Sequence, residues 1–296
     1  MFPAALAMAL FATSSVAARR SIHFLGPNNA SLVRILLATT LLGVYAHTYG
    51  AGFSGPALGW FLLSGFVGFG ICDTALFLAL PRLGAQMASL LVQCLSVPIG
   101  LFTEWAWLGT TPTPPQLGAI LVILTGVFIA LKPSASSAAS HPGATALTLG
   151  CIAAAGQGLG AVISRHGTQL AAQSGHPIDG LSVAYQRIGA GVAFIAVWWM
   201  FQRIRQVPSH PDATPQWKPA LPWIWVNALS GPTLGVACYQ WALSRQPTGI
   251  VMAVTSLTPL AVIPIAWHFN GERPSRASLV GGAIGIAGVI VLGLLR

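Results

Sequence analysis

Two stretches of the sequence decide the fold. Residues 79–93 read ALPRLGAQMASLLVQ and residues 242–256 read ALSRQPTGIVMAVTS, so the second stretch repeats the first at an offset of 163 residues (242 − 79 = 163). Three weaker matches lie in the same order along the chain and pair 34–35 with 187–188, 109–112 with 271–274, and 126–127 with 288–289. Four matches in one order predict that the chain is a duplicated unit.

The composition indicates that this unit lies in a membrane. Of the 296 residues, 54% are apolar and 6% are charged, whereas an ordinary soluble domain has about 25% charged residues. A soluble globular enzyme and a disordered chain are therefore nearly excluded, since the first needs a charged surface and the second needs low hydrophobicity. The net charge of +9 is scattered along the chain and forms no dense patch, so we expect no nucleic-acid partner.

Ten apolar segments follow one another along the chain. A crossing of about 30 Å needs roughly 20 helical residues, and helices are expected because an open strand cannot satisfy its backbone in lipid. The segments are approximately 3–18, 30–46, 57–80, 84–106, 115–131, 144–164, 181–202, 220–243, 247–268 and 277–295. The sequence thus predicts an all-α polytopic membrane protein with ten transmembrane helices.

A polar run at the midpoint separates the two halves. Residues 132–143 read KPSASSAASHPG, which is typical of a linker. We therefore expect a first repeat at 1–131 and a second at 144–296, with five helices each. Because five is odd, the second repeat must be inverted in the membrane. Inverted repeats with a binding site near the midplane are typical of secondary transporters.

The residues also resemble a known family. The shared features are the segment order, an arginine at the start of the second and seventh segments, the AL-x-R ends at 79–82 and 242–245, and Ser-Leu-Thr-Pro at 256–259 followed by Gly-Glu at 271–272. Together they resemble the EamA-type branch of the drug/metabolite transporter superfamily over essentially the whole chain. The first half departs from this pattern, with Thr110 in the place of Glu272.

The resemblance implies a ten-helix secondary carrier in which helices one to four and six to nine surround the pathway. Helices five and ten would then act as scaffold. Export of an amino acid or a related compound by alternating access is the activity that the resemblance favours. The location expected for such a carrier is a bacterial inner membrane.

The sequence contains no phosphate-cradling loop, no metal-ligand spacing and no nucleophile–base constellation. We therefore expect no catalytic residues, metal or cofactor, and no enzyme activity. Two alternatives remain, namely a non-transporting membrane receptor or assembly subunit, and an intramembrane enzyme. The expected partners are a small-molecule substrate, the lipid bilayer and a coupling ion or proton, with the chain as a monomer or a homodimer.

Asp73 is the sharpest candidate for the transport pathway. A charge at the bilayer centre costs about 2.5–3.5 kcal/mol on insertion scales, so an intramembrane carboxylate is a functional candidate by default. One helical turn away on either side lie Phe69 and Phe77, and a carboxylate between aromatic rings suits an amine, a cation or a proton. The alternative is a structural ion pair between Arg34 and Asp73.

A polar stripe follows the fourth segment. Gln86, Gln93 and Glu104 are 7 and 11 residues apart, which places them on one helix face at about 100° per residue. Such a row faces a cavity or another helix rather than lipid. Glu104 alternatively lies close enough to the interface to be solvated. In the sixth segment, Gln157 repeats the pattern weakly.

The second half adds further pathway candidates. Arg187 is suited to a substrate carboxylate, although a lone arginine at a helix end also snorkels to the headgroups. Prolines that interrupt equivalent segments are expected to act as helix hinges. The remaining pathway candidates are Tyr185, Tyr239, Gln240 and Thr255, and the expected hinges are Pro98, Pro259 and Pro264.

The basic residues give an orientation. Ten lie on the side reached after the first segment and four on the other, and positive charge marks the cytoplasm. The first group is Arg19, Arg20, Arg34, Arg82, Lys132, Arg203, Arg205, Lys218, Arg273 and Arg276, and the second is Arg165, Arg187, Arg245 and Arg296. The charges thus predict both termini outside the cytoplasm, whereas the family resemblance implies both inside.

Overall fold

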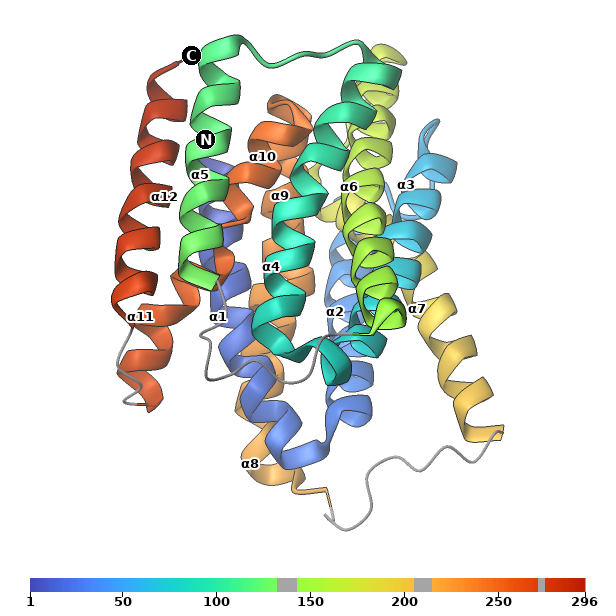
Figure 1. Ribbon diagram of the computed structural model, residues 1–296. Coiled ribbons are helices and arrows are strands. Elements are labelled where there is room, and N and C mark those ends of the chain that lie inside the picture. The colour runs from blue at the N-terminus through green and yellow to red at the C-terminus, as the bar shows by residue number, and fades with distance from the viewer. Residues whose placement is uncertain (132–142, 205–214, 271–274, 296) are drawn as a thin grey trace.

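The computed structural model describes residues 1–131, 143–204, 215–270 and 275–295, and within these ranges all regular structure is helical (Figure 1). Most of the linker expected at 132–143 and Glu272 lie outside the described residues. The α-helices are α1 Phe2–Leu25, α2 Pro27–Thr48, α3 Leu58–Gly65, α4 Cys72–Leu108, α5 Pro114–Leu131, α6 Ala144–Gln173, α7 Gly180–Ile204, α8 Trp217–Ala228, α9 Leu234–Arg245, α10 Thr248–Thr255, α11 Thr258–Asn270 and α12 Arg276–Leu294.

The membrane crossings agree with the ten expected segments. Within the described ranges, nine helical runs are long and apolar enough to cross a membrane. The one expected segment not among these runs, the eighth at 220–243, corresponds to α8, a π-helical segment at Leu229–Thr233 and α9 in direct succession. These three have 12, 5 and 12 residues, so each alone is short, but together they run for 29 residues. The prediction of an all-α polytopic membrane protein is confirmed.

The connection between the third and fourth segments differs from the prediction. A break was expected between 80 and 84, but α4 stays helical over 37 residues, which would measure about 55 Å if straight. The apolar windows Leu58–Leu76 and Met87–Leu108 remain separate, and the teal ribbon of Figure 1 changes direction between them. The return between these two windows is therefore made by helical backbone.

Two π-helical segments occupy equivalent places in the two halves. The first is Phe66–Ile71, between α3 and α4, and the second is Leu229–Thr233, between α8 and α9. Their starts are 163 residues apart (229 − 66 = 163), which is the offset of the sequence repeat. The same irregularity at the same repeat position supports duplication at the level of backbone geometry. Such π-bulges frequently occur at functional sites.

Glycines hold α5 and α12 together at one edge of the bundle (Figure 1). A methyl group at Gly126 would lie 2.6 Å from the carbonyl oxygen of Gly281 and 2.6 Å from the backbone nitrogen of Gly285. The two backbones are therefore in contact, as small residues permit in membrane helices. Helices α5 and α12 therefore pack on each other at the edge, and the remaining helices form the rest of the bundle (Figure 1).

Helix α6 lies against α4 along much of its length. The glycines at 156 and 158 permit this approach, since a methyl group at Gly158 would lie 2.9 Å from the carbonyl oxygen of Ser96. The hydroxyl of Ser64 in α3 donates to the carbonyl oxygen of Gly160 at 2.6 Å. The close contact brings the polar residues of α4 and α6 to one depth.

Candidate functional site

A cavity of about 270 Å³ lies among helices from both halves of the chain. Six of the nine pathway residues predicted from the sequence line it, and they come from α4, α6, α7, α9 and α10. The lining residues are Phe11, Gly68, Phe69, Cys72, Asp73, Gln93, Gln157, Ala161, Arg187, Val236, Tyr239, Thr255 and Thr258. We call this space the central cavity.

Two side chains of opposite charge, Asp73 and Arg187, line the central cavity and are not paired with each other. Asp73 is in the first turn of α4, directly after the π-helical segment, and Arg187 is two turns inside α7. Within the described residues, no ion pair joins Asp73 to Arg187 at a nitrogen–oxygen distance of 4.0 Å or less. Opposite charges that line one cavity from two helices without a direct contact leave room for a ligand between them.

Arg187 is buried rather than directed to the headgroups, since only 6% of it is exposed. Its guanidinium carbon lies 5.4 Å from the ring centroid of Phe69, within the range of a cation–π contact. A methyl group at Gly68 would be 3.1 Å from Nη2 of Arg187, so the glycine leaves space for the guanidinium. Its Nε has no hydrogen-bond partner in the described part of the chain.

Two amides meet across the cavity wall. Nε2 of Gln157 in α6 donates to Oε1 of Gln93 in α4 at 3.4 Å. This distance exceeds the ordinary 2.7–3.2 Å range, and each amide retains further donor and acceptor capacity. A polar ligand is therefore able to replace this weak contact.

Three predicted pathway residues are not among those that line the central cavity. Tyr185 is two residues before Arg187, about 200° around the helix, and its hydroxyl lies 3.1 Å from Nε2 of His47. Gln240 follows Tyr239 by one residue, and its Oε1 accepts from the hydroxyl of Ser164 at 2.5 Å. The side chain of Gln86 is outside the described part of the structure.

The alternative for Asp73, a structural ion pair with Arg34, is not seen. Within the described residues, no nitrogen of Arg34 comes within 4.0 Å of a carboxylate oxygen of Asp73. Nε of Arg34 is buried and has no hydrogen-bond partner there. Asp73 lines the central cavity, whereas Arg34 is absent from its lining. The Asp73 carboxylate therefore faces the central cavity and is not held by Arg34.

Of the three expected hinges, Pro259 alone coincides with a helix break. Helix α10 ends at Thr255 and α11 begins at Thr258, so Pro259 is the second residue of the new helix. The hydroxyl of Thr258 donates to the carbonyl oxygen of Thr255 at 2.6 Å. Pro98 and Pro264 lie inside unbroken helices. Movement at any of the three remains a prediction.

A buried ion pair was missed by the sequence analysis. Nε of Arg165 lies 2.7 Å from Oε1 of Glu104, and the side chains are 11% and 1% exposed. The alternative that Glu104 is solvated near the interface is therefore wrong, and its place in a buried polar stripe holds. Helix α6 continues to Gln173 instead of ending near 164, so Arg165 points into the bundle and not into a loop. The polar stripe that contains Glu104 was the available signal.

The same ion pair binds the connection between α9 and α10. Nη1 of Arg165 donates to the carbonyl oxygen of Leu243 at 2.6 Å and to that of Gln246. Oε2 of Glu104 accepts from the backbone nitrogen of Thr248 at 2.7 Å. One charged pair thus joins α4 and α6 to the end of α9 and the start of α10.

Comparison with known proteins agrees with this architecture. The model of the EamA-like transporter family matches residues 1–132 and again residues 144–294. None of the curated proteins matches the sequence. Among the solved structures that are similar, one crystal structure has a TM-score of 0.77 at 19% identity, over 99% of this chain and 96% of that chain. At this identity the likeness shows the fold alone.

Proposed function

Because the chain belongs to the EamA-like transporter family, we propose that it is a secondary transporter for an amino acid or a closely related zwitterion. The observation that carries this proposal is the pair of unlike charges, Asp73 and Arg187, on the wall of the central cavity. The direction that we propose is export, which rests on the family resemblance.

The charges match the two ends of a zwitterion. A buried guanidinium without a hydrogen-bond partner at Nε is expensive in a membrane interior, and a ligand carboxylate would offset this cost. Asp73 is suited to the ligand ammonium in the same way. A substrate with only one charge would leave one of the two side chains without a partner.

The size and the other lining residues favour a small ligand with an apolar part. The volume of about 270 Å³ is just below the usual range of about 300–1,000 Å³ for ligand pockets. Phe11, Phe69 and Val236 supply apolar contacts, while Gln93 and Gln157 supply amides. Leucine combines two charged groups with a compact apolar side chain and serves as a probe.

We propose that the two repeats, 1–131 and 144–296, rock against each other around this cavity. Its lining residues come from both repeats, as expected for a site between inverted repeats. The helix break before Pro259 and the two π-helical segments are the places where the backbone departs from regular α-helix. We propose that the protein is located in a bacterial inner membrane. The coupling partner that we propose is a proton or another ion.

Uptake into proteoliposomes tests the proposal. A tritiated amino-acid mixture that includes L-leucine is offered to wild type, Asp73→Asn and Arg187→Gln. The matched control is Arg276→Gln, which removes one charge at the exposed start of α12. We expect uptake by wild type and control and at least a tenfold loss in both cavity variants. Unchanged uptake in both cavity variants, or none in wild type, would contradict the proposal.

A further inference from the structure

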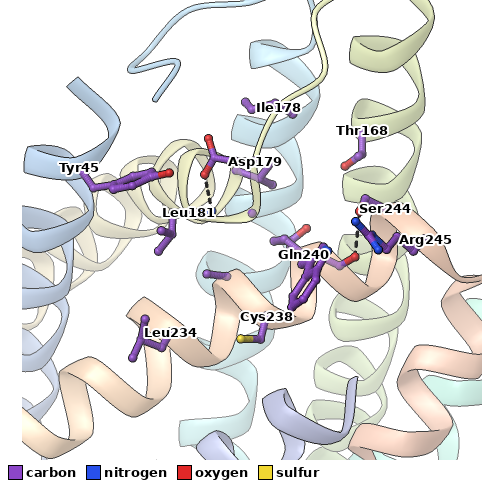
Figure 2. Close-up of a pocket in the computed structure, with 14 residues that line it drawn as sticks. Tyr45, Thr168, Ile178, Asp179, Leu181, Leu234, Cys238, Gln240, Ser244 and Arg245 are labelled. Atoms are coloured by element: carbon purple, nitrogen blue, oxygen red, sulfur yellow. Dashed lines mark hydrogen bonds between the residues drawn. The ribbon is translucent and has the colours of Figure 1, made fainter. Parts of the chain in front are cut away.

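A second and larger cavity, of about 510 Å³, lies where α7 begins and α9 ends. Figure 2 shows it between α2, α6, α7 and α9. Its lining includes Tyr45, Thr168, Asp179, Gln240, Trp241 and Arg245. We call this space the vestibule.

The vestibule and the central cavity follow one another along the same helices. On α6 the vestibule is lined by Thr168 and the central cavity by Ala161, a spacing of seven residues or about 10 Å. Between these two residues, the hydroxyl of Ser164 donates to Gln240 of α9 at 2.5 Å. This hydrogen bond therefore joins α6 to α9 at the depth that separates the two spaces.

The vestibule also has one acid and one base. Asp179 precedes α7 and Arg245 ends α9, and the two side chains lie on different walls of the space (Figure 2). The guanidinium carbon of Arg245 is 5.2 Å from the ring centroid of Trp241, so a cation–π contact favours this orientation of the cation.

Asp179 is fixed by its own helix. Its Oδ1 accepts from the backbone nitrogens of Leu181 and Ser182 at 2.9 and 3.0 Å, and its Oδ2 accepts from the hydroxyl of Ser182 at 2.6 Å. A carboxylate has about four acceptor positions; these three bonds leave one, and a ligand ammonium would take the place of the Tyr45 hydroxyl there. The hydroxyl of Tyr45 points toward this carboxylate (Figure 2).

The buried ion pair holds the other wall in place. Arg165 binds the carbonyl oxygens of Leu243 and Gln246, which flank Arg245. Arg165 is in turn held by Glu104 at 2.7 Å. The end of α9, which carries Trp241 and Arg245, is thus positioned by side chains outside the vestibule, as expected for a preorganised site.

We propose that the vestibule is a second binding site for the zwitterionic substrate class, on the route to the central cavity. This inference rests on the proposed function. The ligand carboxylate binds Arg245, its ammonium binds Asp179, and its side chain lies against the apolar wall that includes Leu181 and Ala237. Passage between the two sites requires the hydrogen bond between Ser164 and Gln240 to open.

Binding stoichiometry tests this proposal. Tritiated L-leucine is titrated onto the purified protein in nanodiscs of phosphatidylethanolamine and phosphatidylglycerol. We expect two equivalents per wild-type chain and one for Arg245→Gln or Asp179→Asn, since asparagine retains the helix cap but lacks the charge. The doubly substituted Asp73→Asn, Arg187→Gln protein should also bind one equivalent, which the further change Arg245→Gln should remove.

Arg82→Gln is the matched control, because Arg82 is the exposed repeat counterpart of Arg245 and does not line the vestibule. It should bind two equivalents. If wild type binds one equivalent and Arg245→Gln still binds one, the vestibule site is overturned. Amino-acid uptake by wild type would in that case still support the proposed transporter. A second equivalent seen in detergent but absent in these nanodiscs would assign the vestibule to a lipid headgroup and also overturn the proposal. Absence of both binding and uptake would overturn both proposals.

Discussion

The ion pair between Glu104 and Arg165 gives the sharpest prediction on stability. Glu104→Gln keeps the size of the side chain but removes the charge that lies 2.7 Å from Nε of Arg165. The guanidinium then remains buried without an anionic partner, and only neutral oxygens, those of Leu243, Gln246 and at most the new amide, accept from it. Breaking one side of a buried pair typically costs about 3–5 kcal/mol.

This cost should be visible as a lower melting temperature. For large domains, a loss of 1 kcal/mol lowers the midpoint by about 2–4 °C, so Glu104→Gln should lower it by at least about 6 °C. The assay is thermal unfolding of the detergent-solubilised protein followed by fluorescence-detected gel filtration. The control is Arg276→Gln, which changes an exposed charge and should shift the midpoint by less than about 2 °C.

A double variant separates the pair from its two members. In Glu104→Gln, Arg165→Gln, two neutral amides face each other and no uncompensated charge stays buried. The double variant should therefore be more stable than the sum of the two single losses predicts. The reasoning is refuted if Glu104→Gln melts within about 2 °C of wild type, or if the two losses simply add.

Three further predictions follow from the cavity and the helix packing. In a cysteine-free background, Gln93→Cys should react with a small hydrophilic thiol reagent, whereas Phe102→Cys, nine residues further on the opposite, 65% exposed face of α4, should not; equal reactivity would place Gln93 in helix packing. Gly126→Leu should lower the free energy of unfolding by about 1–3 kcal/mol, as is typical of overpacking, and hence the melting temperature, because a Cβ there already lies 2.6 Å from the carbonyl oxygen of Gly281. Gly118→Leu in the same helix should not, since nothing lies within 4 Å of a Cβ at that position. Arg34→Gln should not restore uptake to Asp73→Asn, because the two side chains form no ion pair; restored uptake would return Asp73 to a structural role.

The fold could be predicted because its signals are spread over many residues. Ten apolar runs and four repeat matches do not depend on any single helix end. Helix ends depend on a few residues, and two errors occurred there. The connection near Pro81 is helical, and α6 extends to Gln173. Because α6 was expected to end near residue 164, Arg165 was placed in a loop, and its buried pairing with Glu104 was not predicted.

The site was predicted in part for a similar reason. Residues at one depth and on one helix face, such as Gln93 and Gln157, were found because spacing alone defines a face. Tyr185 and Gln240 have the right depth but lie about 200° and 100° around their helices from Arg187 and Tyr239. The orientation of a whole helix about its axis depends on its neighbours, and a single sequence does not contain that information.

The most direct test of the account is a change of substrate preference at the central cavity. Uptake of tritiated L-leucine into proteoliposomes is measured in competition with isocaproate, which lacks the ammonium, and with isoamylamine, which lacks the carboxylate. In wild type, unlabelled leucine should compete at least tenfold better than either analogue. In Asp73→Asn, isocaproate should compete as well as leucine, and in Arg187→Gln isoamylamine should do so, since each variant has lost the partner of the missing group. Equal competition by all three compounds in wild type, or the same preference in all three proteins, would contradict the assignment of Asp73 and Arg187 to the two ends of a zwitterion.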